Sequence, residues 1–225
     1  MSQDEKAVVR EYFNTTGFER WQRIYGEAQV NRVQLAIRRG HQRTLTAILG
    51  GLGSVKGLTI CDAGCGVGSL SVPLARGGAT VFATDISEQM VEEAARRWQQ
   101  EGAPGDLTFR VQELETLAGS FNIVVCVDVL IHYPLPQAEV MLTHLSQLAK
   151  DRLLFTFAPQ TPLLSLLKRV GNFFPGAAKA TRAYQHPEAQ LRELLVRLGW
   201  RVDSCTAINE QFYFARLLDC SRQSR

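Results

Sequence analysis

The sequence contains no run of eighteen or more apolar residues, so we expect no helix of the chain to span a membrane. Its first residues, Met-Ser-Gln-Asp-Glu-Lys, lack the apolar stretch of a secretory signal. The net charge of +3 is too small to indicate nucleic-acid binding by itself. With 225 residues, 45% of them hydrophobic, the chain is long enough for one α/β domain, and a second full domain is not expected.

Cysteine gives no sign of a disulfide framework or a zinc site. The five cysteines are odd in number, and Cys61 and Cys126 lie inside apolar runs typical of buried strands. None of the spacings resembles a zinc-binding pattern, so we expect no metal bound by the protein itself. We therefore expect reduced core cysteines and a cytoplasmic protein.

The basic residues gather in two segments. Residues 18–43 contain six arginines and only two glutamates, and residues 160–187 contain two lysines and two arginines without any acid. Such segments indicate either an anionic partner or two solvated faces, and the sequence leaves both interpretations open.

Apolar segments alternate with helical ones through the middle of the chain, as in a parallel sheet. The expected strands are 58–63, 80–84, 107–111, 122–127 and 152–157, with helices at 70–75, 88–100 and 137–149 between them. Ser87 is expected to cap the second of these helices. Pro187 and Glu188 open a further helix that ends at Gly199, with Pro187 in its first turn. Two final strands, 200–207 and 210–217, are close enough in sequence to pair antiparallel.

We therefore predict an α/β fold with a seven-stranded, mostly parallel sheet and helices on both faces. Residues 1–50 are predicted to form a helical lid or arm, and residues 51–225 the main domain. Residues 159–186, after the fifth strand, are predicted to form an insert.

A glycine-rich motif, Asp62-Ala-Gly64-Cys-Gly66-Val-Gly68, lies where the first strand turns into a helix. Glycines there allow a sharp bend and close approach to a ligand. The third glycine comes two residues after the second, whereas a dinucleotide site has it three residues later. Asp62, the acid two residues before the first glycine, suits a cationic ligand better than a pyrophosphate. The arrangement resembles the motif of class I methyltransferases, which implies a Rossmann-like methyltransferase domain and S-adenosylmethionine as cofactor.

Three acids are candidate cofactor ligands. Asp85 ends the second strand, where a carboxylate can accept both hydroxyls of a ribose or cap the next helix. Glu113 follows the third strand, where the resemblance implies a contact with the adenine amino group; a solvated loop residue is the alternative. Asp62 is expected either to brace the glycine turn or to face the methionine end of the cofactor. By the same resemblance, Cys65, Ile86 and Met90 complete the expected cofactor-binding set.

Four runs agree with one family, and the three that lie outside the glycine motif are more specific than it. The motif belongs to the run from Cys61 to Ser71; the other three are the segment from Tyr12 to Gly26, the run Asp128-Val-Leu-Ile-His-Tyr-Pro134, and Phe174-Pro-Gly176 followed by Thr181-Arg-Ala-Tyr-Gln-His186. Together they resemble the magnesium-protoporphyrin IX O-methyltransferase family essentially from end to end. Asn122 departs from the family pattern, in which Asp often follows Phe, and we expect little consequence.

The resemblance implies methyl transfer from S-adenosylmethionine to one propionate of magnesium-protoporphyrin IX in chlorophyll biosynthesis, with magnesium present only as part of the substrate. A propionate has a pKa of about 4 to 5, by analogy with Glu, so it needs no strong base at neutral pH. The site must then position and desolvate the carboxylate. The large porphyrin-binding subunit of magnesium chelatase and a peripheral contact with photosynthetic membranes are the further partners that the resemblance implies.

His132 and Tyr25 are the candidate catalytic residues. His132 lies just past the fourth strand and could orient the substrate carboxylate, ligate the porphyrin magnesium or brace its own loop. Tyr25 belongs to the segment that the family uses as a lid; its hydroxyl could hold the substrate carboxylate or that of the cofactor, or its ring could pack the lid. Trp21 and Phe18 are interpreted as lid packing.

Substrate contacts are predicted in the N-terminal part and in the insert of the main domain. Arg38, Arg182 and Tyr184 are the candidates, with the apolar side chains of residues 159–186 covering a flat macrocycle or touching a membrane. Two alternatives remain open on the sequence: methylation of another anionic small molecule, and a tetrapyrrole carrier without catalytic activity.

Overall fold

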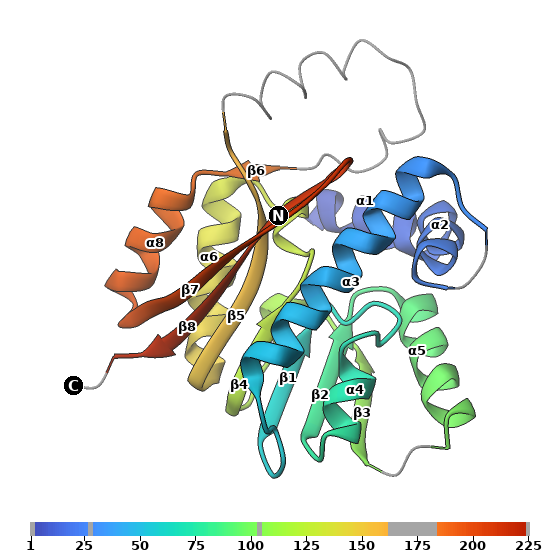
Figure 1. Cartoon of the computed structure of the whole chain (residues 1–225), viewed down its shortest axis with the longest axis horizontal. Helices are drawn as coiled ribbons and strands as arrows, with labels where there is room; N and C mark the ends of the chain where they lie inside the picture. Colours follow the sequence, from blue (N-terminus) through green and yellow to red (C-terminus); the bar gives the residue numbers. More distant parts are fainter. Residues whose placement is uncertain (1–2, 27–28, 103–104, 162–183, 224–225) are drawn as a thin grey trace.

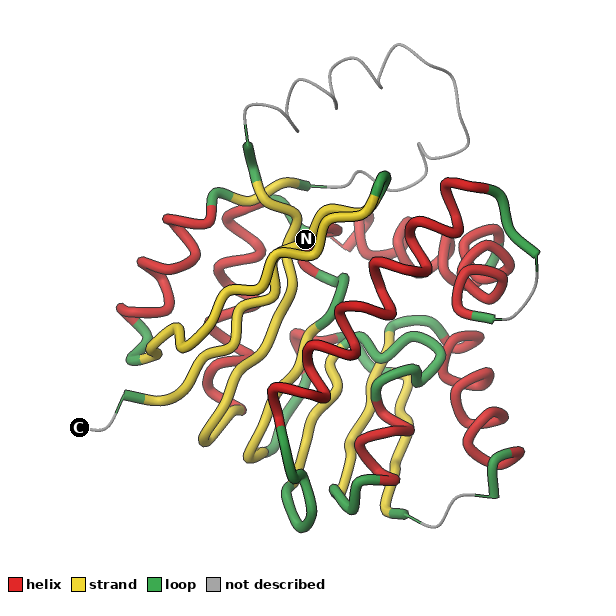
Figure 2. Tube along the Cα trace, in the orientation of Figure 1, coloured by secondary structure: helices red, strands yellow, loops and turns green. Residues whose placement is uncertain are grey.

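The computed structural model describes residues 3–26, 29–102, 105–161 and 184–223. A twisted sheet forms the middle layer, and helices cover both of its faces (Figures 1 and 2). The first two helices lie together at the end of the sheet where the parallel strands finish (Figure 1). Among the helices described, none combines the length and apolarity that crossing a bilayer requires.

The seven strands of the main path run in the order β3-β2-β1-β4-β5-β8-β7. The first five are parallel, and β8 is antiparallel to both β5 and β7. A two-residue strand, β6, pairs with the end of β5 and makes the sheet eight-stranded. The bounds are β1 Thr59–Ala63, β2 Thr80–Asp85, β3 Asp106–Val111, β4 Phe121–Cys126, β5 Ala149–Pro159, β6 Gln185–His186, β7 Trp200–Glu210 and β8 Tyr213–Arg222. The predicted fold class is confirmed, with β6 as an addition.

The N-terminal part is helical, as predicted, and consists of α1 (Gln3–Asn14), α2 (Thr16–Tyr25) and α3 (Arg32–Leu52). A capping box starts α3: the Asn31 side chain accepts from the backbone of Gln34, whose side chain accepts from Asn31 in return. This helix packs against β7 and β8, so it covers the sheet. The predicted boundary between residues 50 and 51 therefore falls inside a helix of the main domain, and α1 and α2 form the part that lies over the strand ends.

The remaining helices follow the strands as the periodicity predicts. They are α4 (Ser71–Arg76), α5 (Glu88–Gln100), the 3₁₀ turns η1 (Leu114–Thr116) and η2 (Leu130–His132), α6 (Leu135–Leu148) and α8 (Glu188–Arg197). The Ser87 side chain accepts from the Met90 backbone and caps α5, as predicted. Pro187 precedes α8 as its N-cap residue, one position before the predicted one.

Alternation along the strands divides the core between the two faces of the sheet. In β1, Ile60 joins the cluster beneath α3 and α4, and Cys61 joins the cluster beneath α6 and α8. In β4, Val125 and Cys126 divide in the same way, because successive side chains of a strand point to opposite faces. The two cysteines are thus buried in strands on the α6 side, as the sequence indicates.

Candidate active site

The turn between β1 and α4 is held against β2 by its backbone. The N–H groups of Gly64 and Cys65 both donate to the Thr84 carbonyl oxygen, at 2.8 Å. Gly64, Gly66 and Gly68 have φ angles of 85°, 51° and 77°, which glycine adopts without steric cost. The motif therefore brings bare backbone to the carboxyl edge of the sheet, where doubly wound folds bind ligands.

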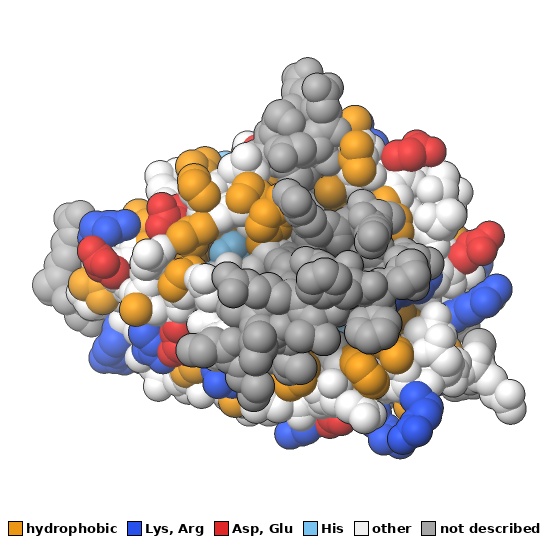
Figure 3. Space-filling model, turned by 90° about the horizontal axis from the view of Figure 1, so that it is seen from above, with side chains coloured by type: hydrophobic (Ala, Val, Ile, Leu, Met, Phe, Trp, Pro, Cys, Tyr) orange, Lys and Arg blue, Asp and Glu red, His pale blue; other side chains and the backbone are white. Residues whose placement is uncertain are grey.

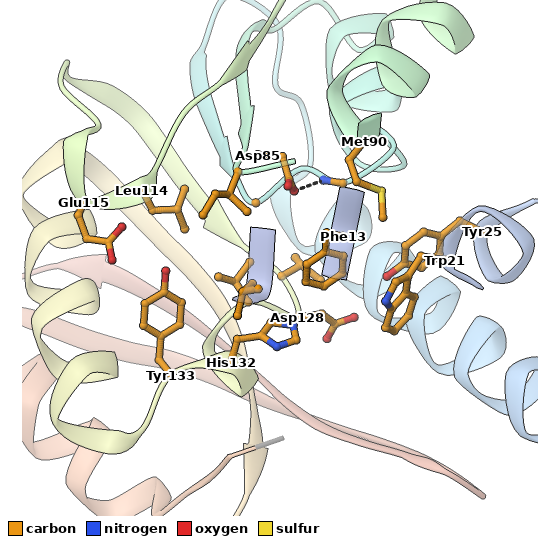
Figure 4. A pocket seen from close by; sticks show the side chains of 16 residues that line it. Phe13, Trp21, Tyr25, Asp85, Met90, Leu114, Glu115, Asp128, His132 and Tyr133 are labelled. Carbon is orange, nitrogen blue, oxygen red and sulfur yellow. Dashed lines mark hydrogen bonds between the residues drawn. The ribbon is translucent and has the colours of Figure 1, made fainter. Parts of the chain in front are cut away.

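Asp85 receives two backbone hydrogen bonds at the end of β2. The Gly66 N–H donates to Oδ2 and the Ser87 N–H to Oδ1, both at 2.9 Å; the first is the dashed line in Figure 4. Burial raises the pKa of this carboxyl, and the two backbone hydrogen bonds oppose the rise. A carboxylate accepts about four hydrogen bonds, so Asp85 keeps acceptor capacity for a pair of ligand hydroxyls. The side-chain cap of α5 comes from Ser87.

Asp62 is buried behind the glycine turn, with 2% of its surface exposed. The Ser71 hydroxyl donates to its Oδ2 atom at 2.5 Å. Burial raises the pKa of Asp62 to about 6, and the Ser71 hydrogen bond opposes that rise. Asp62 also lines a small cavity together with Tyr25, His41 and Cys65. It can therefore both brace the turn and face a ligand.

A cavity of about 790 Å³, its open mouth included, lies beside Gly66 and Asp85. Three carboxylates line it, those of Asp85, Glu115 and Asp128, and no Lys or Arg does so within the described part of the chain. A lining of this charge favours a cationic ligand, such as a sulfonium.

Aromatic side chains of α1 and α2 form the cover of this cavity. Phe13, Trp21 and Tyr25 line it from the lid side (Figure 4). The Ser87 hydroxyl ties the lid to the main domain, because it lies 2.7 Å from the Asn14 side-chain oxygen and 3.1 Å from the Phe13 carbonyl oxygen. The lid thus completes the cavity over the carboxyl ends of the strands.

Tyr25 is packed between two other rings. Its ring centroid lies 5.3 Å from that of Trp21 and 4.4 Å from that of His41. Burial raises the pKa of the Tyr25 hydroxyl well above its usual value, and the charges of Asp128 and Asp85 add to the rise. The hydroxyl therefore stays protonated at neutral pH and can donate a hydrogen bond.

His132 forms part of the opposite wall, at the end of η2. Its Nδ1 atom is buried and has no hydrogen-bond partner within the described residues. Burial lowers the pKa of His132 to about 4, and the charge of Asp128 partly offsets the change. The imidazole is neutral at physiological pH, so it can donate or accept a hydrogen bond but carries no charge. Because Nδ1 bonds to no described residue, it makes no hydrogen bond that would brace the loop.

Other predicted site residues divide between the cavity and its surroundings. Ile86 and Met90 line the cavity along with Gly64, Gly66 and Asp85. Gly68 does not: a side chain there would meet Ala94 and Phe109, so this glycine serves helix–strand packing. Cys65 lines the smaller cavity beside Asp62.

Glu113 lies in a neighbouring groove, paired with Arg10 of α1 at 2.5 Å. The next two residues, Leu114 and Glu115, line the main cavity instead. The acid facing the cavity from this loop is thus Glu115, which the sequence analysis did not select.

The predicted substrate contacts are not brought together by the described residues. Arg38 donates to the carbonyl oxygens of Ile24 and Arg23, at 2.7 and 2.6 Å, and so fastens the end of α2 to α3. The Tyr184 backbone N–H donates to the Ile131 carbonyl oxygen at 2.7 Å, and its side chain does not line the cavity. Arg182 and most of the predicted insert lie outside the described residues.

Asp128 and His41 are site residues that the sequence analysis did not select. Asp128 lines the main cavity, and His41 lies against Tyr25 with Nδ1 3.0 Å from the Asp128 carboxylate. A signal for Asp128 was present, since it begins the run that ends with His132 and Pro134. No local pattern marks His41, because it is 87 residues away in sequence.

Two known families match parts of the chain. Residues 126–222 match the family described as "Magnesium-protoporphyrin IX methyltransferase C-terminus", and residues 60–152 match a general methyltransferase domain. The chain is 49% identical to the magnesium-protoporphyrin O-methyltransferase of Synechocystis sp. PCC 6803 over 97% of both chains. It is 49% identical to the chloroplastic magnesium protoporphyrin IX methyltransferase of Arabidopsis thaliana, over 96% of this chain and 70% of that one. A magnesium-protoporphyrin O-methyltransferase of Rhodobacter capsulatus is 33% identical over 94% of both chains.

Solved structures agree with these relatives. The crystal structure of magnesium protoporphyrin IX methyltransferase from Synechocystis with bound S-adenosylhomocysteine superimposes with a TM-score of 0.88, at 48% identity, over 97% of this chain and all of that one. The structure of that enzyme with bound S-adenosylmethionine gives a TM-score of 0.87, at 44% identity, over 99% of both chains.

Proposed function

Because this chain belongs to the magnesium-protoporphyrin IX methyltransferase family, it methylates magnesium-protoporphyrin with S-adenosylmethionine, and we propose that the methyl acceptor is one propionate carboxylate. The products are then the monomethyl ester and S-adenosylhomocysteine. The observation that supports this acceptor is the unpaired Nδ1 atom of His132, in the wall opposite the protonated Tyr25 hydroxyl.

The cavity fits the methyl donor in charge and in its hydrogen-bond acceptors. S-adenosylmethionine supplies an electrophilic methyl group on a positively charged sulfur. The three carboxylates of the lining favour that charge, and Asp85 has acceptor capacity for a ribose. Apart from its two chain neighbours, no described residue has an atom within 4 Å of a side chain built at Gly66, so the bare backbone there opens onto space for a ligand.

Attack by a propionate needs orientation more than it needs a base. The carboxylate is already ionised at neutral pH, since its pKa is about 4 to 5 by analogy with Glu. His132 and Tyr25 are neutral groups that can each donate one hydrogen bond to it. Such donors hold one oxygen in line with the methyl group without adding a compensating charge that would bind the anion too well in its ground state.

The carboxylates of the lining make the hydrogen-bond donors necessary. Asp128 and Glu115 repel an incoming anion, so the acceptor enters only where neutral donors replace its water. Trp21 contributes a third such group, because its Nε1 atom is buried without a partner among the residues described. Among the described residues of the face above the strand ends, several hydrophobic side chains lie inward of the charged ones, most of which lie toward the rim (Figure 3).

The test is an assay of the purified protein with S-adenosylmethionine and magnesium-protoporphyrin IX. We expect a mass gain of one methyl group that mild alkaline hydrolysis removes, because an ester is hydrolysed and a methylated carbon or nitrogen is not. The matched control is the dimethyl ester of the same porphyrin, in which both carboxylates are blocked, and it should gain nothing. Methylation of that diester would disprove the proposed acceptor.

Turnover of a range of acceptors distinguishes the proposed function from the two alternatives. A methyltransferase for a different anionic small molecule would turn over metal-free protoporphyrin or an unrelated acid faster than the magnesium porphyrin. A carrier without activity would bind the porphyrin and form no ester.

We further propose a cytoplasmic location with peripheral attachment to photosynthetic membranes, and substrate delivery by the large subunit of magnesium chelatase. The apolar composition of residues 159–186 and the family resemblance support both proposals. Sedimentation with anionic lipid vesicles tests the first, and co-purification with the chelatase subunit tests the second. Absence of both associations would leave an enzyme that takes its substrate from solution.

A further inference from the structure

Asp128 has an unusual backbone for a residue with a side chain. Its φ angle is 58°, and no other non-glycine residue in the described part of the chain has a positive φ. Left-handed backbone of this kind costs about 1–2 kcal/mol for most residues, and Asp and Asn tolerate it best. Strain of this type persists where surrounding contacts impose it, often at functional sites.

Three elements of the fold converge on the Asp128 carboxylate. The Tyr213 hydroxyl of β8 donates to Oδ1 at 2.8 Å, and Thr156 of β5 lies 3.3 Å from the same oxygen. The His41 Nδ1 atom of α3 lies 3.0 Å from Oδ2. A carboxylate oxygen only accepts, so His41 carries a hydrogen on Nδ1, and this contact fixes the orientation of the ring.

His41 transmits that orientation to the lid. Its ring packs against Tyr25 with 4.4 Å between centroids and 39° between planes, and Tyr25 in turn stacks on Trp21. Asp128 and Tyr25 line one cavity with His132 (Figure 4). A continuous series of contacts therefore runs from the loop after β4, through α3, to the catalytic face of the lid.

Gly40 of α3 leaves room for the Tyr213 ring, whose hydroxyl binds Asp128. A side chain at Gly40 would lie 2.2 Å from a ring carbon of Tyr213. Glycine inside a helix costs about 1 kcal/mol relative to alanine, so its presence in α3 has a packing reason. That reason is the close approach of β8, which brings the Tyr213 hydroxyl within reach of Asp128.

We propose that Asp128 and His41 form a positioning pair for methyl transfer: the carboxylate fixes the His41 ring, and that ring holds Tyr25 in the cavity. The proposal rests on the function proposed above, in which Tyr25 orients the acceptor carboxylate. Asp128 and His41 act on the reaction through Tyr25.

The test is a double-mutant cycle on kcat. Asp128→Asn removes the charge while keeping a residue type that tolerates positive φ. His41→Phe keeps a ring beside Tyr25 but removes the hydrogen bond to Asp128. We expect each to lower kcat about tenfold in the wild-type background and less than about twofold in a Tyr25→Phe background. The Kd for S-adenosylhomocysteine, which lacks the sulfonium charge that the Asp128 carboxylate favours, should stay within about threefold.

Asp151→Asn is the matched control, since this exposed carboxylate accepts from Asn122 far from the cavity. It should leave kcat unchanged. Equal losses of kcat in the wild-type and Tyr25→Phe backgrounds would mean that the pair does not act through Tyr25 and would overturn the proposal. Wild-type kcat in a folded Asp128→Asn or His41→Phe protein would overturn it as well.

Hydrogen exchange of the α2 peptide tests the positioning pair independently of the proposed function. If Asp128 and His41 hold Tyr25, Asp128→Asn and His41→Phe increase exchange across residues 16–25, and Asp151→Asn does not. This readout requires no turnover, so it stands even if the porphyrin is not the substrate or if Tyr25→Phe retains wild-type kcat. Unchanged exchange in both variants would overturn the positioning pair by itself.

Discussion

The ring of Phe13 in α1 packs edge-on against the ring of His132 after β4, with 5.3 Å between centroids and 87° between planes. The contact joins the N-terminal lid to the wall of the cavity in the main domain. The apolar ring also shields the imidazole from water, and burial is the reason that the pKa of His132 falls to about 4.

Replacing His132 should slow the reaction without releasing the cofactor. We expect His132→Ala to lower kcat by about tenfold to a hundredfold, because an oriented hydrogen bond to the acceptor is lost. The Kd for S-adenosylmethionine, measured by calorimetry, should change by less than about threefold. Because a pKa of about 4 leaves His132 neutral, the kcat of the wild-type protein should show no titration of this group near neutral pH.

The control for His132 is His144→Ala, on α6 in a surface groove away from the cavity. Its kcat should match that of the wild-type protein. A loss of cofactor affinity in His132→Ala equal to the loss of kcat would assign His132 to cofactor binding instead.

The lid should depend on its buried aromatic contact more than on its exposed ion pair. Phe13→Ala removes part of the cavity cover, and we expect cofactor affinity to fall about tenfold, since the apolar surface that the phenyl ring gives to the cavity is lost. Arg10→Ala breaks the pair with Glu113, whose side chains are 46% and 32% exposed. Exposed pairs contribute about 0.2–1 kcal/mol, so its effect should stay below about fivefold. Calorimetric titration with S-adenosylhomocysteine compares the two, and a larger effect from Arg10→Ala would contradict this ranking.

Much of the fold follows from local patterns in the sequence. The helix after Ser87 has the predicted bounds, Glu88–Gln100, because a side-chain cap and a regular apolar face both mark it. Strand ends were less predictable. β5 extends to Pro159 because its end pairs with β6, and β8 extends to Arg222 because its pairing with β7 continues into polar residues. Those pairings depend on partners distant in sequence.

The residues of the candidate site also divide into those marked by a local sequence pattern and those set by contacts distant in sequence. Gly66 and Asp85 were predictable, since one motif and one strand end carry them. The contact between His41 and Asp128 was not, because it joins α3 to the loop after β4. Glu113 directly precedes the 3₁₀ turn η1 and Glu115 lies within it, and the path of that turn decides which of the two acids faces the cavity. Arg38 points to the end of α2, which sequence spacing does not show.

Two glycines of the motif should respond differently to alanine. A Gly66 side chain would enter open space beside Asp85, so we expect a folded protein with weaker cofactor binding. A Gly64 side chain would lie 2.2 Å from a methyl carbon of Val129, so we expect a greater loss of thermal stability. Both positions have positive φ, which adds about 1–2 kcal/mol of strain to each variant. Thermal unfolding and calorimetric titration together separate the two effects, and unchanged cofactor affinity in Gly66→Ala would contradict the assignment of this backbone to the ligand.

Cofactor affinity should depend on pH through Asp62. Burial raises the pKa of this carboxyl to about 6, so the cofactor-free protein holds it largely protonated below that pH. A cationic ligand nearby favours the ionised form, and its binding must then release a proton. Affinity for S-adenosylmethionine should therefore fall as pH decreases through about 6, by up to tenfold per unit for one coupled proton.

Asp62→Asn tests the origin of this dependence. The variant keeps an oxygen that accepts from Ser71 but has no charge to titrate, so its affinity at pH 7.5 should be weaker and should vary less between about pH 5 and 7. Part of the dependence should remain, because burial also raises the pKa of Asp85, beside the same turn. S-adenosylhomocysteine, which lacks the sulfonium charge, should show a smaller pH effect than S-adenosylmethionine in the wild-type protein. Equal pH dependence for the two ligands, unaltered in Asp62→Asn, would mean that Asp62 only braces the glycine turn.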